Sequence, residues 1–277
     1  MRPRRYTTGD GLSLFFRDWG RPGGRTPLLC LPGLVRNSAD FDDFARRHAT
    51  RRRVICPDYR GRGRSDYDSD WRRYQPLTYL DDLRHLLAGE GIGQVAVVGT
   101  SMGGLLAMGL AAASPGMVAA VVLNDVGPDL ASAGIGRILD YIGRDRPQPD
   151  WPSAVAELRR MMPHLSLTGD DKWLRFARAT YRAGDDGMLH FDWDVRLARS
   201  LATGAVPDLW PLFRGLGVPV LAVRGGVSDV LSAGTFARMA DELPQLERIT
   251  VAGCGHCPAL DEPEAVPALD AFLDAVA

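Results

Sequence analysis

Three side chains of types that together perform nucleophilic catalysis are spread along this 277-residue chain. Ser101 lies in Gly99-Thr100-Ser101-Met102-Gly103, which fits a G-x-S-x-G pattern. A serine hydroxyl is a poor nucleophile at neutral pH, so it needs a base within hydrogen-bond reach and an acid that orients the base. We expect His256 to be the base and Asp229 to be the acid. These residues predict acyl transfer through a covalent serine intermediate.

The residues around Ser101 predict a sharp turn between a strand and a helix. The apolar run at residues 95–98 has the length of a buried strand, and residues 105–108 begin a helical pattern. The flanking glycines permit a strained turn, because a Cβ at either position would collide with the strand or the helix. We therefore expect the hydroxyl to project from the tip, beside the first amides of the helix. The G-x-S-x-G pattern also occurs by chance in glycine-rich loops. The strand expected before it and the helix expected after it are what favour a catalytic turn.

The orienting acid has two candidates. Asp229 follows a strand expected at residues 219–223, and His256 follows a strand expected at residues 246–251. In a parallel sheet these loops emerge at the same edge as the turn at Ser101, and the order Ser, Asp, His is that of a known triad arrangement. Asp125 is the rival, because it follows another apolar strand. Aspartate is also common in turns and helix caps, so a structural role is the alternative for Asp229.

Among the five histidines of the chain, His256 alone lies between a glycine-rich turn and a proline at the expected sheet edge. The alternative for His256 is a surface loop position. The other histidines fall on expected helices or in the middle of the chain, and we expect them to be structural or solvated: His48, His85, His164 and His190.

Acyl transfer also requires two hydrogen-bond donors for the oxyanion. One expected donor is the backbone N–H of Met102, the residue after the nucleophile. The second is expected in the loop after the short apolar strand at residues 28–31, where Gly33 lets the chain turn back. We expect the Leu34 N–H to be this donor. The alternative is that Pro32-Gly33 only forms a turn.

Composition argues against several classes of partner. A formal net charge of -1 gives no reason to expect nucleic acid or an anionic membrane, although arginines cluster between residues 46 and 64. No apolar stretch approaches a membrane span, and the basic N-terminus lacks the apolar region of a signal peptide. The four cysteines fit a reducing compartment, and Cys254 and Cys257 lack further zinc ligands at suitable spacing. We expect a cytoplasmic monomer or homodimer with no cofactor and no metal.

The patterns of strands and helices divide the chain into two kinds of segment. A glycine-containing turn at residues 9–11 predicts an antiparallel hairpin. Strands then alternate with helices over residues 1–128 and again over 206–277, which predicts a mostly parallel sheet in one core domain. Residues 129–205 instead predict a helical insertion over the carboxyl edge of the strands. Its amphipathic segments are expected around residues 135–142, 154–165 and 172–181. The alternative is that these helices continue the core layers.

These motifs together resemble the α/β-hydrolase fold superfamily, in particular its serine-nucleophile members that carry a cap. Residues 58–66 (DYRGRGRSD) resemble the D-x-R-G-x-G-x-S stretch of that family, and Gly255-His256 with residues 260–263 resemble its histidine loop. The resemblance covers nearly the whole chain. It implies an eight-stranded, mostly parallel sheet with helices on both faces and a helical cap insertion. The chain departs from many relatives at Leu31-Pro32-Gly33-Leu34, where they carry His-Gly. The expected donor in this loop is a backbone amide, so the missing histidine should not remove it.

The resemblance implies hydrolysis of a carboxylic ester or a related small acyl compound such as a lactone. Ser101 argues against the dehalogenases and epoxide hydrolases of the family, which use a carboxylate nucleophile. C–C bond hydrolases of vinylogous diketones, haloperoxidase-like proteins and non-catalytic ligand receptors remain alternatives. Some bulky residues of the insertion are expected to line the substrate pocket, although most should pack the insertion against the core. The candidates for the pocket are Trp193, Phe191 and Met161.

Overall fold

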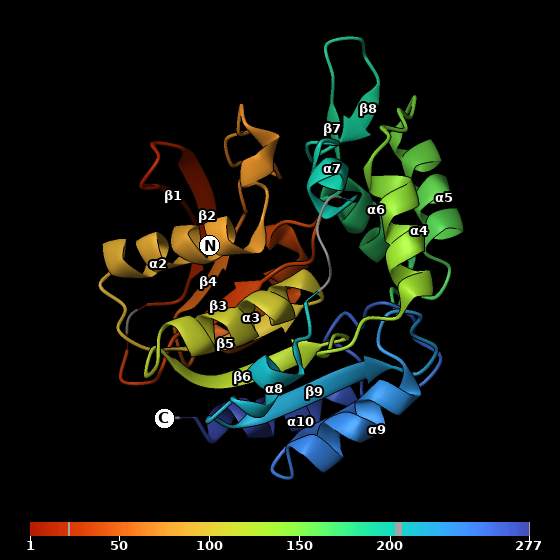
Figure 1. The fold of residues 1–277 in the computed structure, drawn as a ribbon. Helices are drawn as coiled ribbons and strands as arrows, with labels where there is room; N and C mark the ends of the chain where they lie inside the picture. The colour runs from red at the N-terminus through yellow and green to blue at the C-terminus, as the bar shows by residue number, and fades with distance from the viewer. Residues whose placement is uncertain (22, 203–206, 277) are drawn as a thin grey trace.

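The computed structural model describes residues 1–21, 23–202 and 207–276, and an eight-stranded sheet forms the centre of this part of the chain (Figure 1). The strand order is β1-β2-β4-β3-β5-β6-β9-β10. The strands are Arg2–Thr7 (β1), Ser13–Trp19 (β2), Leu28–Leu31 (β3), Val54–Pro57 (β4), Val95–Thr100 (β5), Val118–Asn124 (β6), Val220–Gly225 (β9) and Glu247–Val251 (β10).

The predicted mostly parallel sheet is confirmed. Strand β2 pairs antiparallel with both β1 and β4, and every other neighbouring pair in this sheet is parallel. The predicted hairpin at the start of the chain is the β1–β2 pair, and its turn includes Gly11 at a φ of 90°. Because parallel strands run the same way, the loops that follow β5, β6, β9 and β10 emerge at one edge of the sheet.

Helices cover both faces of the sheet, because side chains alternate between the two faces of each buried strand. Leu29 and Val97 belong to one apolar cluster, whereas Leu28 and Val98 belong to another. The first cluster includes residues of α2, α3, α8 and α9, and the second includes residues of α1 and α10. These helices are Asp42–His48 (α1), Pro76–Gly89 (α2), Met102–Ala113 (α3), Trp210–Arg214 (α8), Ala233–Glu242 (α9) and Ala265–Asp274 (α10), with short 3₁₀ helices at Ser38–Phe41 (η1) and Trp71–Arg73 (η2).

Between β6 and α8 the chain leaves the sheet and forms a separate group of elements, which we call the inserted segment. It comprises Ser132–Ile142 (α4), Trp151–Met161 (α5), Asp170–Arg178 (α6), Tyr181–Ala183 (β7), Leu189–Phe191 (β8) and Leu197–Ala202 (α7). These elements lie together at the end of the sheet toward which the parallel strands point (Figure 1). The three amphipathic segments are helical as predicted, but the antiparallel β7–β8 hairpin was not foreseen. The predicted boundary between residues 205 and 206 lies outside the described residues.

Within residues 1–21, 23–202 and 207–276, no helix combines the length and the apolar character needed to cross a membrane.

Candidate active site

Ser101 occupies the turn between β5 and α3, with φ 53° and ψ -119°. A positive φ is costly for a residue with a side chain and persists only where the surrounding structure imposes it. Here the strand and the helix approach very closely. A Cβ on Gly103 would lie 2.0 Å from the Leu31 carbonyl oxygen, and a Cβ on Gly99 would lie 2.3 Å from the Gly103 carbonyl oxygen. Glycine is therefore required at both positions, and the predicted strand–turn–helix around Ser101 is confirmed.

His256 lies between a hydroxyl and a carboxylate. Its Nε2 atom is 3.0 Å from Ser101 Oγ, and its Nδ1 atom is 2.7 Å from Asp125 Oδ2. The Asp125 side chain is fully buried, and the His256 side chain is 10% exposed. The three residues follow β5, β6 and β10, so the parallel sheet brings them to one edge. This chain of hydrogen bonds has the geometry that activates a serine nucleophile.

Asp125 is held by donors from the end of β9 and from the loop that follows it. The Gly225 N–H donates to Asp125 Oδ1 at 2.8 Å, and the Ser228 hydroxyl donates to Oδ2 at 2.6 Å. The backbone of Asp125 has a φ of 55°, and its own N–H donates to Val223 O at 2.7 Å. A buried carboxylate is costly unless hydrogen-bonded. These contacts therefore both stabilise Asp125 and fix the direction of its carboxylate toward His256.

The prediction that Asp229 orients His256 is contradicted by this geometry. Arg137 of α4 donates to both carboxylate oxygens of Asp229, at 2.6 and 2.9 Å. The Asp229 side chain is 39% exposed, and its bond with Arg137 lowers its pKa. The end of β9 and the loop after it contribute Gly225 and Ser228 as donors to the acid, rather than the acid itself. The order along the chain is still serine, aspartate, histidine, with Asp125, the rival candidate, in the middle.

The two predicted oxyanion donors border Ser101. Met102 is the first residue of α3, so its N–H has no acceptor within the helix. Gly33 and Leu34 line the same cavity as Ser101, and a Cβ on Gly33 would lie 3.8 Å from the Ser101 Cβ. Both amides thus belong to the immediate surroundings of the hydroxyl.

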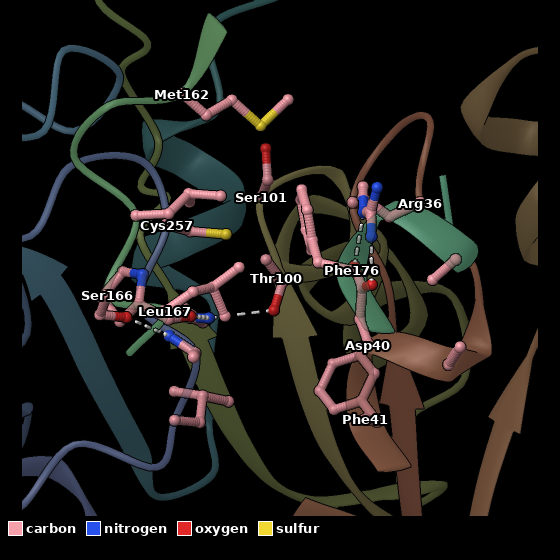
Figure 2. Close-up of a pocket in the computed structure, with 18 of the residues that line it drawn as sticks. Arg36, Asp40, Phe41, Thr100, Ser101, Met162, Ser166, Leu167, Phe176 and Cys257 are labelled. Carbon is pink, nitrogen blue, oxygen red and sulfur yellow. Dashed lines mark hydrogen bonds and ion pairs between the residues drawn. The ribbon is translucent and has the colours of Figure 1, made fainter. Parts of the chain in front are cut away.

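A cavity of about 450 Å³ opens beside Ser101 and His256. Ser101 of the core and Met162 of the inserted segment both point into this cavity, from opposite sides (Figure 2). The inserted segment supplies a largely apolar part of the wall, and the core supplies the serine, the histidine and the loop after β3. The apolar residues from the inserted segment are Ile138, Tyr141, Met162, Leu165, Leu167, Phe176 and Ala179.

Comparison with known sequences agrees with this arrangement. A model of the alpha/beta hydrolase family matches residues 28–269. The chain belongs to the alpha/beta hydrolase family. The matched range includes Ser101, Asp125 and His256.

Individual relatives of this alpha/beta hydrolase are hydrolases by name. It is 32% identical to the 3-hydroxybutyrate-oligomer hydrolase of Cupriavidus necator, over 93% of this chain and 92% of that protein. It is 34% identical to lipase LipV of Mycobacterium tuberculosis, over 90% of this chain and 93% of that protein. Among solved structures, an alpha/beta hydrolase from Novosphingobium aromaticivorans superposes with a TM-score of 0.93 at 45% identity, covering 99% of this chain and 98% of that one.

The predicted pocket residues of this alpha/beta hydrolase do not line the cavity. The rings of Phe191 and Trp193 stack with centroids 4.0 Å apart, and both side chains are buried, at 2% and 3% exposure. The Trp193 indole N–H donates to Ile142 O at 3.1 Å. Met161 packs against the same apolar cluster, while its neighbour Met162 faces the cavity. Both aromatic residues instead pack inside the large apolar cluster, and the Trp193 backbone pairs with Arg62 in the stretch after β4.

The described residues of this hydrolase contain no group of three or more histidine, cysteine, aspartate or glutamate side chains suited to a metal ion. Burial raises the pKa of the Cys254 thiol to about 11, so this cysteine is a neutral thiol near pH 7.

Proposed function

We propose that this protein is a serine hydrolase that cleaves a carboxylic ester through an acyl-enzyme intermediate. The observation that supports it most directly is the hydrogen-bonded chain from Ser101 through His256 to Asp125, beside a cavity of substrate size. This chain also argues against a non-catalytic receptor, because a binding site alone needs no base next to a serine.

The proposed reaction has two halves. Ser101 Oγ attacks the ester carbonyl carbon while its proton passes to His256 Nε2, and Asp125 stabilises the charged imidazole. The N–H groups of Leu34 and Met102 stabilise the oxyanion. The tetrahedral intermediate then collapses, and the alcohol leaves with the proton from His256. A water molecule next gives a proton to His256 and attacks the acyl group, which releases the carboxylic acid and restores the Ser101 hydroxyl.

The cavity favours small acyl substrates that place apolar groups near the serine. Met162 and Phe176 give the wall apolar surface, and a volume of about 450 Å³ suits a compact ligand. The rest of the lining is polar, because five of its six cationic side chains form ion pairs with its four aspartates: Arg17 with Asp42, Arg36 with Asp40, Arg46 and Arg175 with Asp43, and Lys172 with Asp261. We therefore propose short esters of hydroxy acids as substrates, in keeping with the similarity to a 3-hydroxybutyrate-oligomer hydrolase.

The inserted segment is proposed to act as a cap. In this proposal residues 129–205 form the cap, and residues 1–128 and 206–277 form the core domain. Residues of both parts line the cavity, with Met162 on one side and Ser101 on the other (Figure 2). Changes in the inserted segment should accordingly alter substrate preference without altering the chemistry.

Labelling with a fluorophosphonate probe tests the nucleophile. The wild-type protein should be labelled, and Ser101→Ala should abolish the labelling. Ser166 lines the same cavity and donates its hydroxyl to Glu262, so Ser166→Ala is the matched control and should still be labelled. Labelling that persists in Ser101→Ala would remove Ser101 from the reaction.

A substrate panel tests the bond that is cleaved. Purified protein would be assayed with p-nitrophenyl esters, lactones, 3-hydroxybutyrate oligomers and vinylogous diketones. Turnover of esters supports the proposal, and a preference for the oligomers supports the hydroxy-acid class. Cleavage of the diketones alone would instead identify a C–C bond hydrolase, and binding without turnover would identify a receptor.

The cysteines support the proposed cytoplasmic location. All four are free thiols, as expected for a reducing compartment.

A further inference from the structure

Arg62 is a completely buried cation behind the loop that carries Leu34. Its exposure is 0%, and among the described residues no carboxylate lies within ion-pair distance of it. The neighbouring Arg60, in contrast, pairs with three carboxylates, those of Asp10, Asp68 and Asp82. Burial of an unpaired charge is costly, so a protein retains it only where its hydrogen bonds compensate or serve a purpose.

The partners of Arg62 are carbonyl oxygens and aromatic rings. Its Nε–H donates to the Leu34 carbonyl oxygen at 2.6 Å. One terminal nitrogen donates to the Arg60 carbonyl oxygen at 2.7 Å and to the Tyr79 hydroxyl at 2.9 Å. The guanidinium carbon lies 5.4 Å from the ring centroid of Tyr59 and 4.7 Å from that of Tyr79. Both aromatic contacts favour the cation, so the positive charge is stabilised without being neutralised.

Three consecutive carbonyl groups of the loop after β3 each accept a hydrogen bond. The Tyr59 hydroxyl donates to Pro32 O at 3.1 Å, and the Arg36 N–H donates to Gly33 O at 3.1 Å. Arg62 donates to Leu34 O, which is the third. Two of the three donors are side chains from the stretch that follows β4. That stretch therefore fixes the backbone of the loop after β3.

These contacts fix the direction of the Leu34 N–H. The carbonyl of Gly33 and the N–H of Leu34 belong to one planar trans peptide group and point in opposite directions. The bond from Arg36 to Gly33 O therefore sets the Leu34 N–H on the other side of the chain. Rotation of this peptide would also disturb the two neighbouring peptides, which Tyr59 and Arg62 hold. The departure from His-Gly in this loop is thus compensated by side chains from the stretch after β4.

We propose that Arg62 is a positioning residue that presents the Leu34 N–H to the oxyanion, and that its unpaired charge adds to the stabilisation of the oxyanion. This inference rests on the proposed acyl-enzyme function. Fixed donors and charges that need no rearrangement during the reaction stabilise a transition state more than they stabilise the substrate. The effect of Arg62 should therefore appear in kcat and not in KM.

The test compares Arg62→Gln, Arg62→Lys and Tyr59→Phe with the wild type, using p-nitrophenyl ester hydrolysis and inhibition by an alkyl boronic acid that forms a tetrahedral adduct. Arg62→Gln should lower kcat by roughly tenfold to a hundredfold, somewhat less than the loss of one oxyanion donor, with KM nearly unchanged. Boronate affinity should fall by a similar factor. Arg62→Lys keeps the charge and should recover part of kcat, and Tyr59→Phe should lower kcat by severalfold.

Arg52→Gln is the matched control, because Arg52 is also buried, and within residues 1–21, 23–202 and 207–276 its hydrogen bonds go to the backbone carbonyls of Thr26, Leu273 and Val276. It should lower the melting temperature while leaving kcat of the folded protein unchanged. The inference is overturned if Arg62→Gln leaves kcat and boronate affinity at wild-type values, or if only KM changes. If Arg62→Gln does not fold, Arg62→Lys decides by the same criteria, because a lysine cannot reproduce the Nε–H bond to Leu34 O. An inactive wild type that resists fluorophosphonate would instead refute the proposed function.

Discussion

The Nδ1 atom of His256 lies 2.7 Å from Oδ2 of Asp125, which is fully buried at the end of β6. The same carboxylate accepts hydrogen bonds from Gly225, the last residue of β9, and from Ser228 in the loop that follows. These two donors hold the carboxylate against the imidazole. This arrangement separates the two candidate acids, because Asp229 is engaged with Arg137 instead.

Asp125→Asn should lower kcat/KM by about a thousandfold to ten-thousandfold, since an amide cannot stabilise the charged imidazole and favours the wrong tautomer. Asp229→Asn is the matched control and should stay within about threefold of the wild type, since it loses a partly exposed contact with Arg137. Both values would be measured with the same p-nitrophenyl ester. The opposite ranking of the two variants would assign the acid to Asp229.

Gly103→Ala should destabilise the protein by at least about 2 kcal/mol, because the new Cβ would lie 2.0 Å from the Leu31 carbonyl oxygen. Gly136→Ala in α4 is the control, because its Cβ would meet no atom within 4 Å. It should be neutral or stabilise by up to about 1 kcal/mol, as alanine favours a helix over glycine. Urea unfolding measures both. Equal effects would show that close packing at the turn is not what requires glycine.

Met162→Ala should shift the substrate preference toward longer acyl chains, because Met162 lines the cavity. The measurement is the ratio of kcat/KM for long and short p-nitrophenyl esters, which should rise severalfold. Phe191→Ala is the contrasting variant, because Phe191 stacks on Trp193 inside the inserted segment. It should lower stability by about 3 to 5 kcal/mol without changing that ratio in the protein that remains folded. An altered ratio only in Phe191→Ala would return Phe191 to the pocket.

Burial raises the pKa of Asp192 to about 6, and repulsion from Asp58 adds to the shift. The ordinary pKa of an aspartate is about 3.9, so between about pH 4 and 6 the unfolded chain releases a proton that the folded protein retains. The contribution of Asp192 to stability therefore falls as pH rises through this window. Asp192→Asn removes the cost of the buried negative charge. The free energy of unfolding of the variant should exceed that of the wild type by about 1 to 3 kcal/mol at pH 7.5 and be almost equal to it at pH 4.

The measurement for Asp192 is the difference in melting temperature between variant and wild type at the two pH values. Asp186→Asn is the control of opposite sign, because a hydrogen bond with His190 lowers the pKa of Asp186. That variant should melt at the same or a lower temperature than the wild type at pH 7.5. A gain for Asp192→Asn that does not depend on pH would show that ionisation of Asp192 is not its cause.

The sequence by itself determined the features that depend on neighbouring residues. The turn at Ser101 was predictable because Gly99 and Gly103 relieve steric conflicts between adjoining segments. The hairpin at the N-terminus and the helices of the inserted segment follow from turn residues and apolar periodicity. His256 was predictable because its loop follows a strand that ends at the same edge as β5.

The tertiary structure decided which side chains meet. Asp125 and Asp229 both follow strands, and the choice between them depends on how the loops after β6 and β9 fold over each other and on Arg137 in a distant helix. Tertiary packing also decided that Phe191 stacks on Trp193 instead of lining the cavity. It likewise decided that Arg62 bonds to Leu34, which lies in a separate loop. Steric conflicts within a turn depend on a few adjacent residues and can be predicted from them. Contacts between distant segments depend on strand order, register and packing, which no short stretch of sequence contains.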